Sequence, residues 1–314
     1  MPEHDIIVVG ASAGGVEALQ QLVRQLSPGL PAAVFVVLHL PPRTRSLLPE
    51  ILTRAGQLPA LHPENGTAIE PGHIYVAPPD HHLVVERGHI HLSLGPKEQH
   101  HRPCINVMFR SAALAYGDRV TAVVLTGELD DGTAGLWEVK RRGGIAVVQN
   151  PEGAAFPSMP LSALREVEAD YVVDITGIGA LLTRLASEKG AGKRTEVEGA
   201  KMEPQLTDLT CPDCRGTIWE VTRENGSGSG KEYRCRVGHT FSPKSMLSEH
   251  FAAQEKALYA AIVALEEGAS LTTRLAEQFE PPLNHRLREE ARQREMQAET
   301  LRRILKERMS FTLD

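Results

Sequence analysis

Three polar residues, Ser12, His39 and Asp131, are of the types that together carry out nucleophilic acyl transfer. A serine hydroxyl is a poor nucleophile until an imidazole accepts its proton, and the imidazole needs a buried carboxylate to fix its tautomer and to stabilise its charged form. Each of the three follows an apolar run that is typical of a buried strand. Because ligands bind outside the carboxyl ends of the strands in an open parallel sheet, we expect all three side chains to face one crevice.

Ser12 lies in the segment GASAGG, between an apolar run at residues 6–9 and a stretch with apolar residues at helical spacing. The pattern Gly10-x-Ser12-x-Gly14 predicts a sharp strand-to-helix turn that exposes the serine hydroxyl. Unpaired N–H groups at the start of the helix would then supply part of an oxyanion site. A phosphate-binding loop is the alternative, but the glycine spacing G-x-x-x-G-G matches neither the dinucleotide pattern nor a P-loop.

His39 directly follows the apolar run 33–38, and Asp131 follows the run 121–126 through a short loop. Each residue also has a structural interpretation, since His39 could cap a strand and Asp131 could N-cap a helix. Three such residues at three strand ends favour the catalytic interpretation.

Several linked segments, in the order in which they occur, resemble the catalytic domain of the chemotaxis protein-glutamate methylesterases of the CheB type. The segments are GASAGGVEAL, VVLHLPP, PGHIYVAPPDHHL, LTGELDDGTAGL and VVQNPEGAAFPSMP, and the resemblance covers roughly residues 4–185. It implies a doubly wound, mostly parallel α/β sheet of Rossmann-like type. It also implies hydrolysis of glutamate methyl esters on chemoreceptor signalling helices, with deamidation of glutamine in some members, and no catalytic cofactor.

The resemblance implies that Ser12 is the nucleophile, His39 the general base and Asp131 the orienting carboxylate, with its neighbour Asp130 outside the triad. It places the oxyanion site at backbone N–H groups of Ala13 and of the loop before the aspartate. That loop departs from the family pattern, which has methionine and glycine where this chain has Glu128 and Leu129. A carboxylate pointing inward would disfavour an oxyanion, so we expect the Glu128 side chain to point outward.

Two further departures are Cys104 and Asn106, where the family pattern leads us to expect serine and aspartate. We expect them to alter the substrate cleft without touching the triad. Family members commonly carry a receiver domain before the esterase, whereas the first catalytic strand here begins near Asp5. We therefore expect activity that is constitutive or controlled by another part of the chain or by a partner.

Composition and charge limit the partners of the protein. The chain has 314 residues, 41% of them hydrophobic, and a net charge of −6, so it can form one large core with smaller modules. Without a basic stripe or an apolar stretch of about 20 residues, we expect neither nucleic-acid binding nor membrane insertion. Without a signal pattern, we expect a cytoplasmic location. The resemblance to the CheB type implies as partners the cytoplasmic helices of a chemoreceptor and, through them, a methyltransferase-linked signalling complex.

The pattern of elements divides the chain into four parts. Strands and helices alternate over 1–187, the methylesterase-like domain, in which residues 84–91 predict an antiparallel hairpin at the sheet edge. Residues 188–207 are polar and glycine-containing and predict a linker. A small module at 208–245 and a helical region at 246–314 follow.

The small module contains Cys211, Cys214, Cys235 and His239, which have the spacing of two metal-binding knuckles joined by a hairpin. This spacing predicts a zinc ribbon with a closed structural zinc site. The alternatives are reduced cysteines in a hairpin or a C-x-x-C redox pair, although no thioredoxin-like pattern surrounds the pair. Its mixed charges favour protein contact over nucleic acid. The histidines of the first domain, including His100 and His101, lack the spacing of a ligand set.

Two helical stretches flank Pro281-Pro282, with apolar residues on one side and many Arg and Glu on the others. They predict a helical hairpin or a dimerising coil, and so a homo-oligomer, or else a helix pair that covers the esterase core. Two alternative functions stay open, namely an esterase or amidase with another substrate and a catalytically weak adaptor that binds receptor helices.

Overall fold

The computed structural model describes residues 4–39, 46–188, 204–225 and 228–308 and divides into two compact units, 1–246 and 247–314. The first unit contains the α/β domain and a small β module; the second is helical. Most of the linker expected at 188–207 lies outside the described residues.

A seven-stranded parallel sheet forms the centre of the α/β domain, with the strand order β3-β4-β2-β1-β7-β8-β9. This order confirms the predicted doubly wound fold, and the direction of winding reverses between β1 and β7. Ligands bind at such a switch point. The strands are β1 (Ile6–Ala11), β2 (Ala33–Leu38), β3 (Ala60–Leu61), β4 (Ile74–Val76), β7 (Val120–Val124), β8 (Ile145–Gln149) and β9 (Tyr171–Val173).

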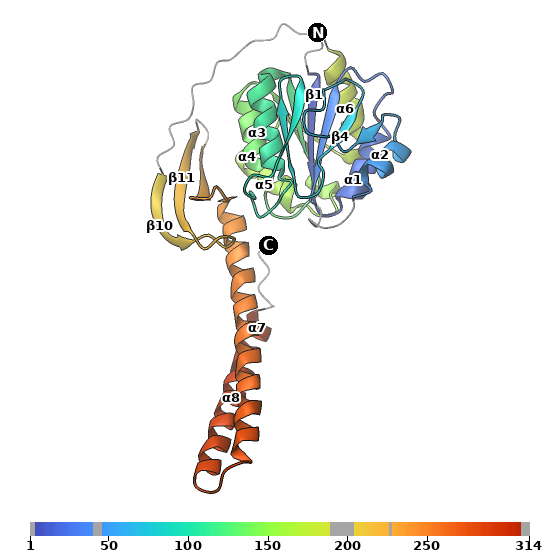
Figure 1. Cartoon of the computed structure of the whole chain (residues 1–314). Helices are drawn as coiled ribbons and strands as arrows, with labels where there is room; N and C mark the ends of the chain where they lie inside the picture. The colour runs from blue at the N-terminus through green and yellow to red at the C-terminus, as the bar shows by residue number, and fades with distance from the viewer. Residues whose placement is uncertain (1–3, 40–45, 189–203, 226–227, 309–314) are drawn as a thin grey trace. The chain divides into compact units, whose positions relative to one another are not determined.

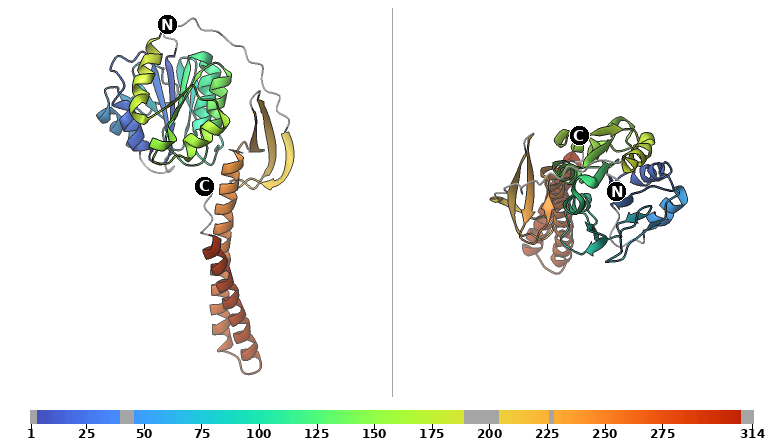
Figure 2. Two further views of the ribbon diagram at one scale, coloured as in Figure 1. Left: turned by 180° about the vertical axis from the view of Figure 1, so that it is seen from behind. Right: turned by 90° about the horizontal axis from the view of Figure 1, so that it is seen from above.

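Helices cover both faces of this sheet, as Figures 1 and 2 show. Alternate residues of β1 enter two separate cores, with Ile7 and Val9 on one face and Ile6 and Val8 on the other. The first face packs against α1 (Gly15–Val23), α2 (Leu48–Ala55) and α6 (Ile175–Ser187). The second packs against α3 (Ile105–Tyr116), α4 (Thr133–Arg141) and α5 (Ser158–Glu166), and short 3-10 turns lie at Gly117–Arg119 and Pro151–Gly153.

The predicted hairpin is present as β5 (His82–Glu86) and β6 (His89–Ser93), with Gly88 at φ 82° in its turn. Its expected place at the sheet edge is wrong, because β5 and β6 form a separate two-stranded sheet and β3 and β9 are the edge strands. The hairpin instead buries Leu83, Val85 and Ile90 in the same core as α3.

The β module, defined here as residues 204–246, contains a four-stranded antiparallel sheet and the first turn of the following helix. Its strands are β10 (Pro204–Thr210), β11 (Thr217–Asn225), β12 (Gly228–Cys235) and β13 (Thr240–Phe241). Residues 204–207, expected in the linker, belong to β10, whose first three residues pair with β11. The module has its own small core, formed by Cys211, Ile218, Cys235, Phe241 and Met246.

The second unit confirms the predicted helical hairpin. It consists of the greater part of α7 (Pro243–Ala276) together with α8 (Leu283–Arg308). Apolar residues recur at helical spacing on both helices and pack together, namely Leu258, Ile262 and Leu265 of α7 with Ala298, Leu301 and Leu305 of α8. None of the helices in the described ranges has the length and apolar character needed to cross a membrane.

Candidate active site

Ser12 lies directly after β1, in the turn that leads into α1. The Ser12 N–H donates to the Thr126 carbonyl at 3.0 Å, and the Ser12 carbonyl accepts from the Gly15 N–H at 2.9 Å. Gly14 has φ 69°, a left-handed conformation that glycine adopts without steric cost, so the chain reverses within three residues. The sequence pattern for an elbow is therefore realised as a strand-to-helix turn.

The structure brings Ser12, His39 and Asp131 into one chain of hydrogen bonds. His39 directly follows β2, its Nδ1 lies 3.0 Å from Ser12 Oγ, and its Nε2 lies 2.8 Å from Asp131 Oδ2. The His39 side chain is 9% exposed and that of Asp131 is 3% exposed. When Nε2 carries the proton that Asp131 accepts, the lone pair of Nδ1 is available for the serine proton.

Asp131 is an ionised carboxylate in a buried position. The backbone N–H groups of Ile105 and Asn106, at the start of α3, donate to its two oxygens at 2.8 and 3.0 Å, and its own neighbour Gly132 donates at 2.8 Å. Burial alone would raise the pKa of Asp131, but the hydrogen bond and charge of His39 and the Ile105 N–H outweigh burial and hold that pKa well below its usual range. Asp131 thus caps α3 and orients His39 at once.

Cys104 and Asn106 contact Asp131 directly, so the expectation that they leave the proposed triad untouched is wrong. The start of α3 points at Asp131, and Cys104 Sγ donates to Asp131 Oδ1 at 3.2 Å. Burial raises the pKa of the Cys104 thiol well above its ordinary value, which keeps the thiol protonated and able to donate. Asn106 Oδ1 accepts from the N–H groups of Gly132 and Gly135 at 3.1 and 2.7 Å and so caps α4 in turn.

The loop after β7 lies against Ser12. A Cβ atom at Gly127 would lie 2.9 Å from Ser12 Cβ, a distance that only glycine avoids. Thr126 ties this loop to the elbow, because its Oγ1 donates to the Ala13 carbonyl at 3.0 Å and accepts from the Phe156 N–H at 2.8 Å. Glu128 is exposed, as expected. Sequence reasoning missed Thr126, whose role follows from contacts across 113 and 30 residues.

Asp130 is buried like its neighbour but lies in a different environment. Its side chain is 6% exposed, and its Oδ1 has no hydrogen-bond partner within the described part of the chain. Burial raises the pKa of Asp130 to about 6, against the opposing effect of a hydrogen bond with Ser242. The two adjacent carboxyl groups therefore differ in charge over a range in which both would ordinarily be ionised.

The three cysteines and one histidine of the β module converge into one potential metal-binding group, the four-ligand cluster. Cys214 Sγ lies 3.6 Å from Cys235 Sγ, and His239 Nδ1 lies 3.7 Å from Cys211 Sγ and 3.5 Å from Cys235 Sγ. Over the described ranges, it is the one group of three or more such residues found.

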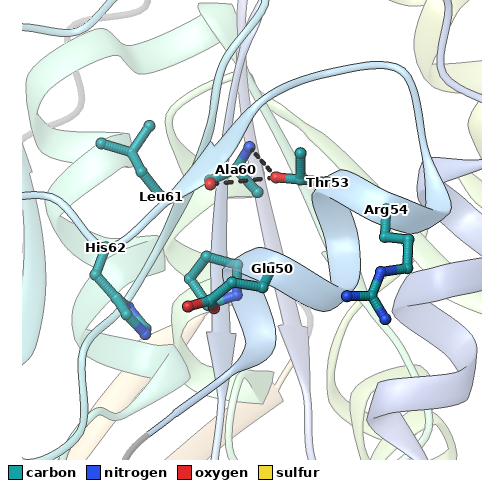
Figure 3. Close-up of a pocket in the computed structure, with 7 residues that line it drawn as sticks. Glu50, Thr53, Arg54, Ala60, Leu61 and His62 are labelled. Carbon is teal, nitrogen blue, oxygen red and sulfur yellow. Dashed lines mark hydrogen bonds between the residues drawn. The ribbon is translucent and has the colours of Figure 1, made fainter.

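A pocket lies apart from these residues, between α2 and β3 at the far edge of the sheet (Figure 3). The Thr53 hydroxyl accepts from the Ala60 N–H at 2.9 Å and donates to the Ala60 carbonyl at 3.3 Å, which fixes one wall. The triad residues do not line this pocket.

Comparison with known proteins identifies the α/β domain. Residues 7–182, more than half of the chain, match the CheB methylesterase family. The chain belongs to this family. The crystal structure of the Thermotoga maritima CheB methylesterase catalytic domain matches with a TM-score of 0.56 and 33% identity, over 58% of this chain and 98% of that domain.

Curated CheB methylesterase relatives extend the match. A protein-glutamate methylesterase/protein-glutamine glutaminase 2 from Methanosarcina mazei is 35% identical over 180 residues, 55% of this chain and 49% of the relative. A putative protein-glutamate methylesterase/protein-glutamine glutaminase from Leptospira interrogans is 34% identical over 183 residues, 58% of this chain and 95% of the relative. The chain spans about half the length of the Methanosarcina relatives. The family match ends before the β module begins.

Replacement of Asp131 by asparagine tests the hydrogen-bond chain. Asp131→Asn should lower turnover of a small ester on the order of 10⁴-fold, because an amide no longer selects the His39 tautomer or stabilises its charged form. Asp130→Asn is the matched control and should change turnover less than about threefold, well below the effect of losing a triad member. Steady-state kinetics on both variants decides, and equal losses would contradict this assignment.

Asp130 should also make stability depend on pH. Its pKa of about 6 in the folded protein exceeds the value of about 3.9 expected for the unfolded chain, so the free energy of unfolding should fall as pH rises from about 4 to about 6. Asp130→Asn removes this loss and should be more stable than the wild type at pH 8 by on the order of 3 kcal/mol. At pH 4 the difference should be much smaller.

Urea unfolding at both pH values measures the two differences. A difference that is equal at pH 4 and pH 8 would show that Asp130 does not titrate in this range.

Proposed function

We propose that the protein is a serine hydrolase that demethylates glutamate methyl esters on the cytoplasmic helices of chemoreceptors. The observation that carries this proposal is the chain of hydrogen bonds from Ser12 through His39 to Asp131 in a domain of the CheB methylesterase family. The names of the relatives, protein-glutamate methylesterase/protein-glutamine glutaminase, support both the ester substrate and a second activity on glutamine.

In the proposed mechanism, Ser12 Oγ attacks the carbonyl carbon of the glutamate side-chain ester while His39 Nδ1 takes the hydroxyl proton. Asp131 accepts the hydrogen bond from Nε2 and stabilises the imidazolium that forms. His39 then donates its proton to the leaving methoxide, and methanol departs from the acyl-enzyme. Water, activated by His39 in the same way, releases the glutamate carboxylate and regenerates Ser12. With glutamine, ammonia takes the place of methanol.

We infer that the oxyanion is bound by the backbone N–H groups of Ala13 and Glu128. Two neighbouring N–H groups are already used, since that of Ser12 donates to Thr126 and that of Gly127 donates to the Phe156 carbonyl at 3.0 Å. The close approach of the loop after β7 to Ser12 supports this assignment. The exposed side chain of Glu128 supports an orientation away from the oxyanion, which speaks against an inactive adaptor.

We further propose that the four-ligand cluster binds a structural zinc ion. Tetrahedral zinc with Zn–S of about 2.3 Å and Zn–N of about 2.0–2.1 Å requires S···S of about 3.8 Å and S···N of about 3.6 Å. The separations in the structure, 3.6 Å for sulfur to sulfur and 3.5 and 3.7 Å for sulfur to nitrogen, fit those values. The zinc would stabilise a module whose own apolar core is small.

Three broader proposals concern the setting of the protein. We expect it to act in the cytoplasm, as part of a methyltransferase-linked signalling complex, because a demethylating enzyme needs a methylated receptor. Exposed apolar side chains on the helical hairpin support self-association through α7 and α8, among them Tyr259, Val263, Leu271 and Met296.

The proposed activity is tested by methanol release from a methylated chemoreceptor signalling fragment. The wild type should release methanol, and Ser12→Ala should reduce the rate on the order of 10⁴-fold or more because the nucleophile is lost. Ser187→Ala, the same substitution at the end of α6, should match the wild type. If wild-type protein hydrolyses a small ester but leaves the receptor methylated, the substrate assignment is wrong.

The zinc proposal predicts one tightly bound zinc ion per chain, measured by atomic emission on protein purified without chelators. Cys211→Ser should lose the ion, because a neutral hydroxyl replaces a thiolate ligand. Cys104→Ser is the matched control and should retain it, since Cys104 lies in the α/β domain outside the cluster. Wild-type protein without bound zinc would contradict the zinc proposal.

A further inference from the structure

A second imidazole, that of His101, covers one face of the His39 ring. The two ring centroids lie 3.7 Å apart and the planes differ by 12°. Burial and, next, the charge of His39 lower the pKa of His101 to about 3, so His101 is neutral at physiological pH. A neutral aromatic face favours the positive charge that His39 acquires during proton transfer, whereas a second cation would oppose it. His39 is thus fixed by Ser12 and Asp131 at its two nitrogens and by His101 on its face.

His101 belongs to a tight turn at residues 98–101. The Glu98 N–H donates to the His101 carbonyl at 3.2 Å, and the His101 N–H donates to the Glu98 carbonyl at 2.9 Å. The two central residues, Gln99 and His100, have φ values of 51° and 65°. Side-chain-bearing residues seldom adopt this left-handed conformation, and they keep it only where the surroundings fix it.

The β module fixes the turn through Gln99, which is 5% exposed. The Gln99 N–H donates to the Thr240 carbonyl at 2.6 Å. The Gln99 Oε1 accepts from the Ser242 N–H at 3.0 Å and also from the Ser245 hydroxyl. The backbone and the side chain of one residue in the turn are therefore both bound to the β module.

The contacts with the turn fall beside the ligands of the four-ligand cluster. His100 Nδ1 lies 3.0 Å from Asp213 Oδ1, and Asp213 lies inside the knuckle that supplies the first two cysteines. Thr240, which binds Gln99, directly follows His239. A metal ion that fixes the two knuckles therefore also fixes both partners of the turn.

The same module contacts the loop that carries Asp131. Lys244 Nζ donates to Ser158 Oγ at 2.9 Å, and Ser158 Oγ donates to the Leu129 carbonyl at 3.3 Å. Leu129 precedes Asp131 by two residues, so the module reaches the triad through a second, independent route.

We propose that the β module is a metal-dependent positioning element of the active site. Metal in the four-ligand cluster fixes the knuckles, the knuckles fix the 98–101 turn, and the turn places His101 against His39. His101 is a positioning residue that acts through His39. The inference rests on the proposed function in that His39 is taken as the catalytic base. It adds that occupancy of a metal site outside the matched family region sets the turnover of the enzyme.

The test uses the full chain with Gln99→Asn, which shortens the side chain by one methylene. Its carbonyl then no longer reaches Ser242 and Ser245, while asparagine tolerates the left-handed conformation. Gln205→Asn is the matched control, the same change at an exposed position of β10. The readouts are zinc content, the histidine ring resonances in ¹H–¹⁵N NMR spectra, and kcat and KM for p-nitrophenyl acetate.

Gln99→Asn should keep its zinc, shift the ring resonances of His39 and His101, and lower kcat about tenfold or more with KM little changed, because misplacing a catalytic group by about 1 Å costs up to about 10²-fold. Removal of zinc from the wild type by a chelator should produce the same shifts of the ring resonances and the same loss of kcat. Gln205→Asn should change neither. His101→Ala should lose kcat to a similar extent, and His101→Phe, which restores a flat uncharged ring, should recover most of it.

The histidine ring spectra are also recorded for Ser12→Ala protein, with and without zinc. These spectra report the surroundings of the His39 ring independently of any esterase activity. Zinc-dependent shifts together with a wild-type protein that hydrolyses no ester would count against the proposed function alone. The inference would be overturned if the His39 ring resonances shifted neither on zinc removal nor in Gln99→Asn. An active wild type whose kcat is unchanged by Gln99→Asn, or protein that binds no zinc, would also overturn it.

Discussion

The rest of the candidate active site depends on the hydrogen bonds that stabilise the buried, ionised carboxylate of Asp131. Removing a carboxylate from water costs several kcal/mol unless hydrogen-bond donors replace the solvent. Here the replacement comes from the first turn of α3, from the residue after Asp131 itself, from the Cys104 thiol and from His39. The sheet must therefore place the ends of β1, β2 and β7 next to the start of α3. The doubly wound order does this by making β1 the neighbour of both other strands.

Asp130 shows that burial alone does not keep the pKa of a carboxyl group low. It is nearly as buried as Asp131, but its pKa is raised where that of Asp131 is lowered. The difference lies in the donors, because only Asp131 faces the start of a helix and an imidazole. The pKa values of adjacent residues of the same type are thus shifted in opposite directions by the local geometry of one loop.

Local patterns in the sequence were enough to predict the elbow at Ser12 and the strand that ends before His39, because glycine spacing and apolar runs act over a few residues. Spacing also groups Cys211, Cys214, Cys235 and His239, whose potential ligand atoms lie within 4.8 Å of one another. The roles of Asn106, Thr126 and His101 could not be predicted this way. Each depends on a contact between segments distant in the chain, and only the packing of the helices and the β module creates those contacts. The position of the β5–β6 hairpin was misjudged because alternation reveals a buried face but not the element that covers it.

The exchange of caps between α3 and α4 has a consequence for local unfolding near Asp131. Asp131, at the entry to α4, caps α3, and Asn106, in the first turn of α3, caps α4. Neither helix can fray at its start without exposing unpaired N–H groups on the other, which makes the two first turns a single cooperative unit. Asp131 therefore lies where the starts of two helices open only together. Brief local openings, such as those that admit solvent to surface loops, leave its position intact.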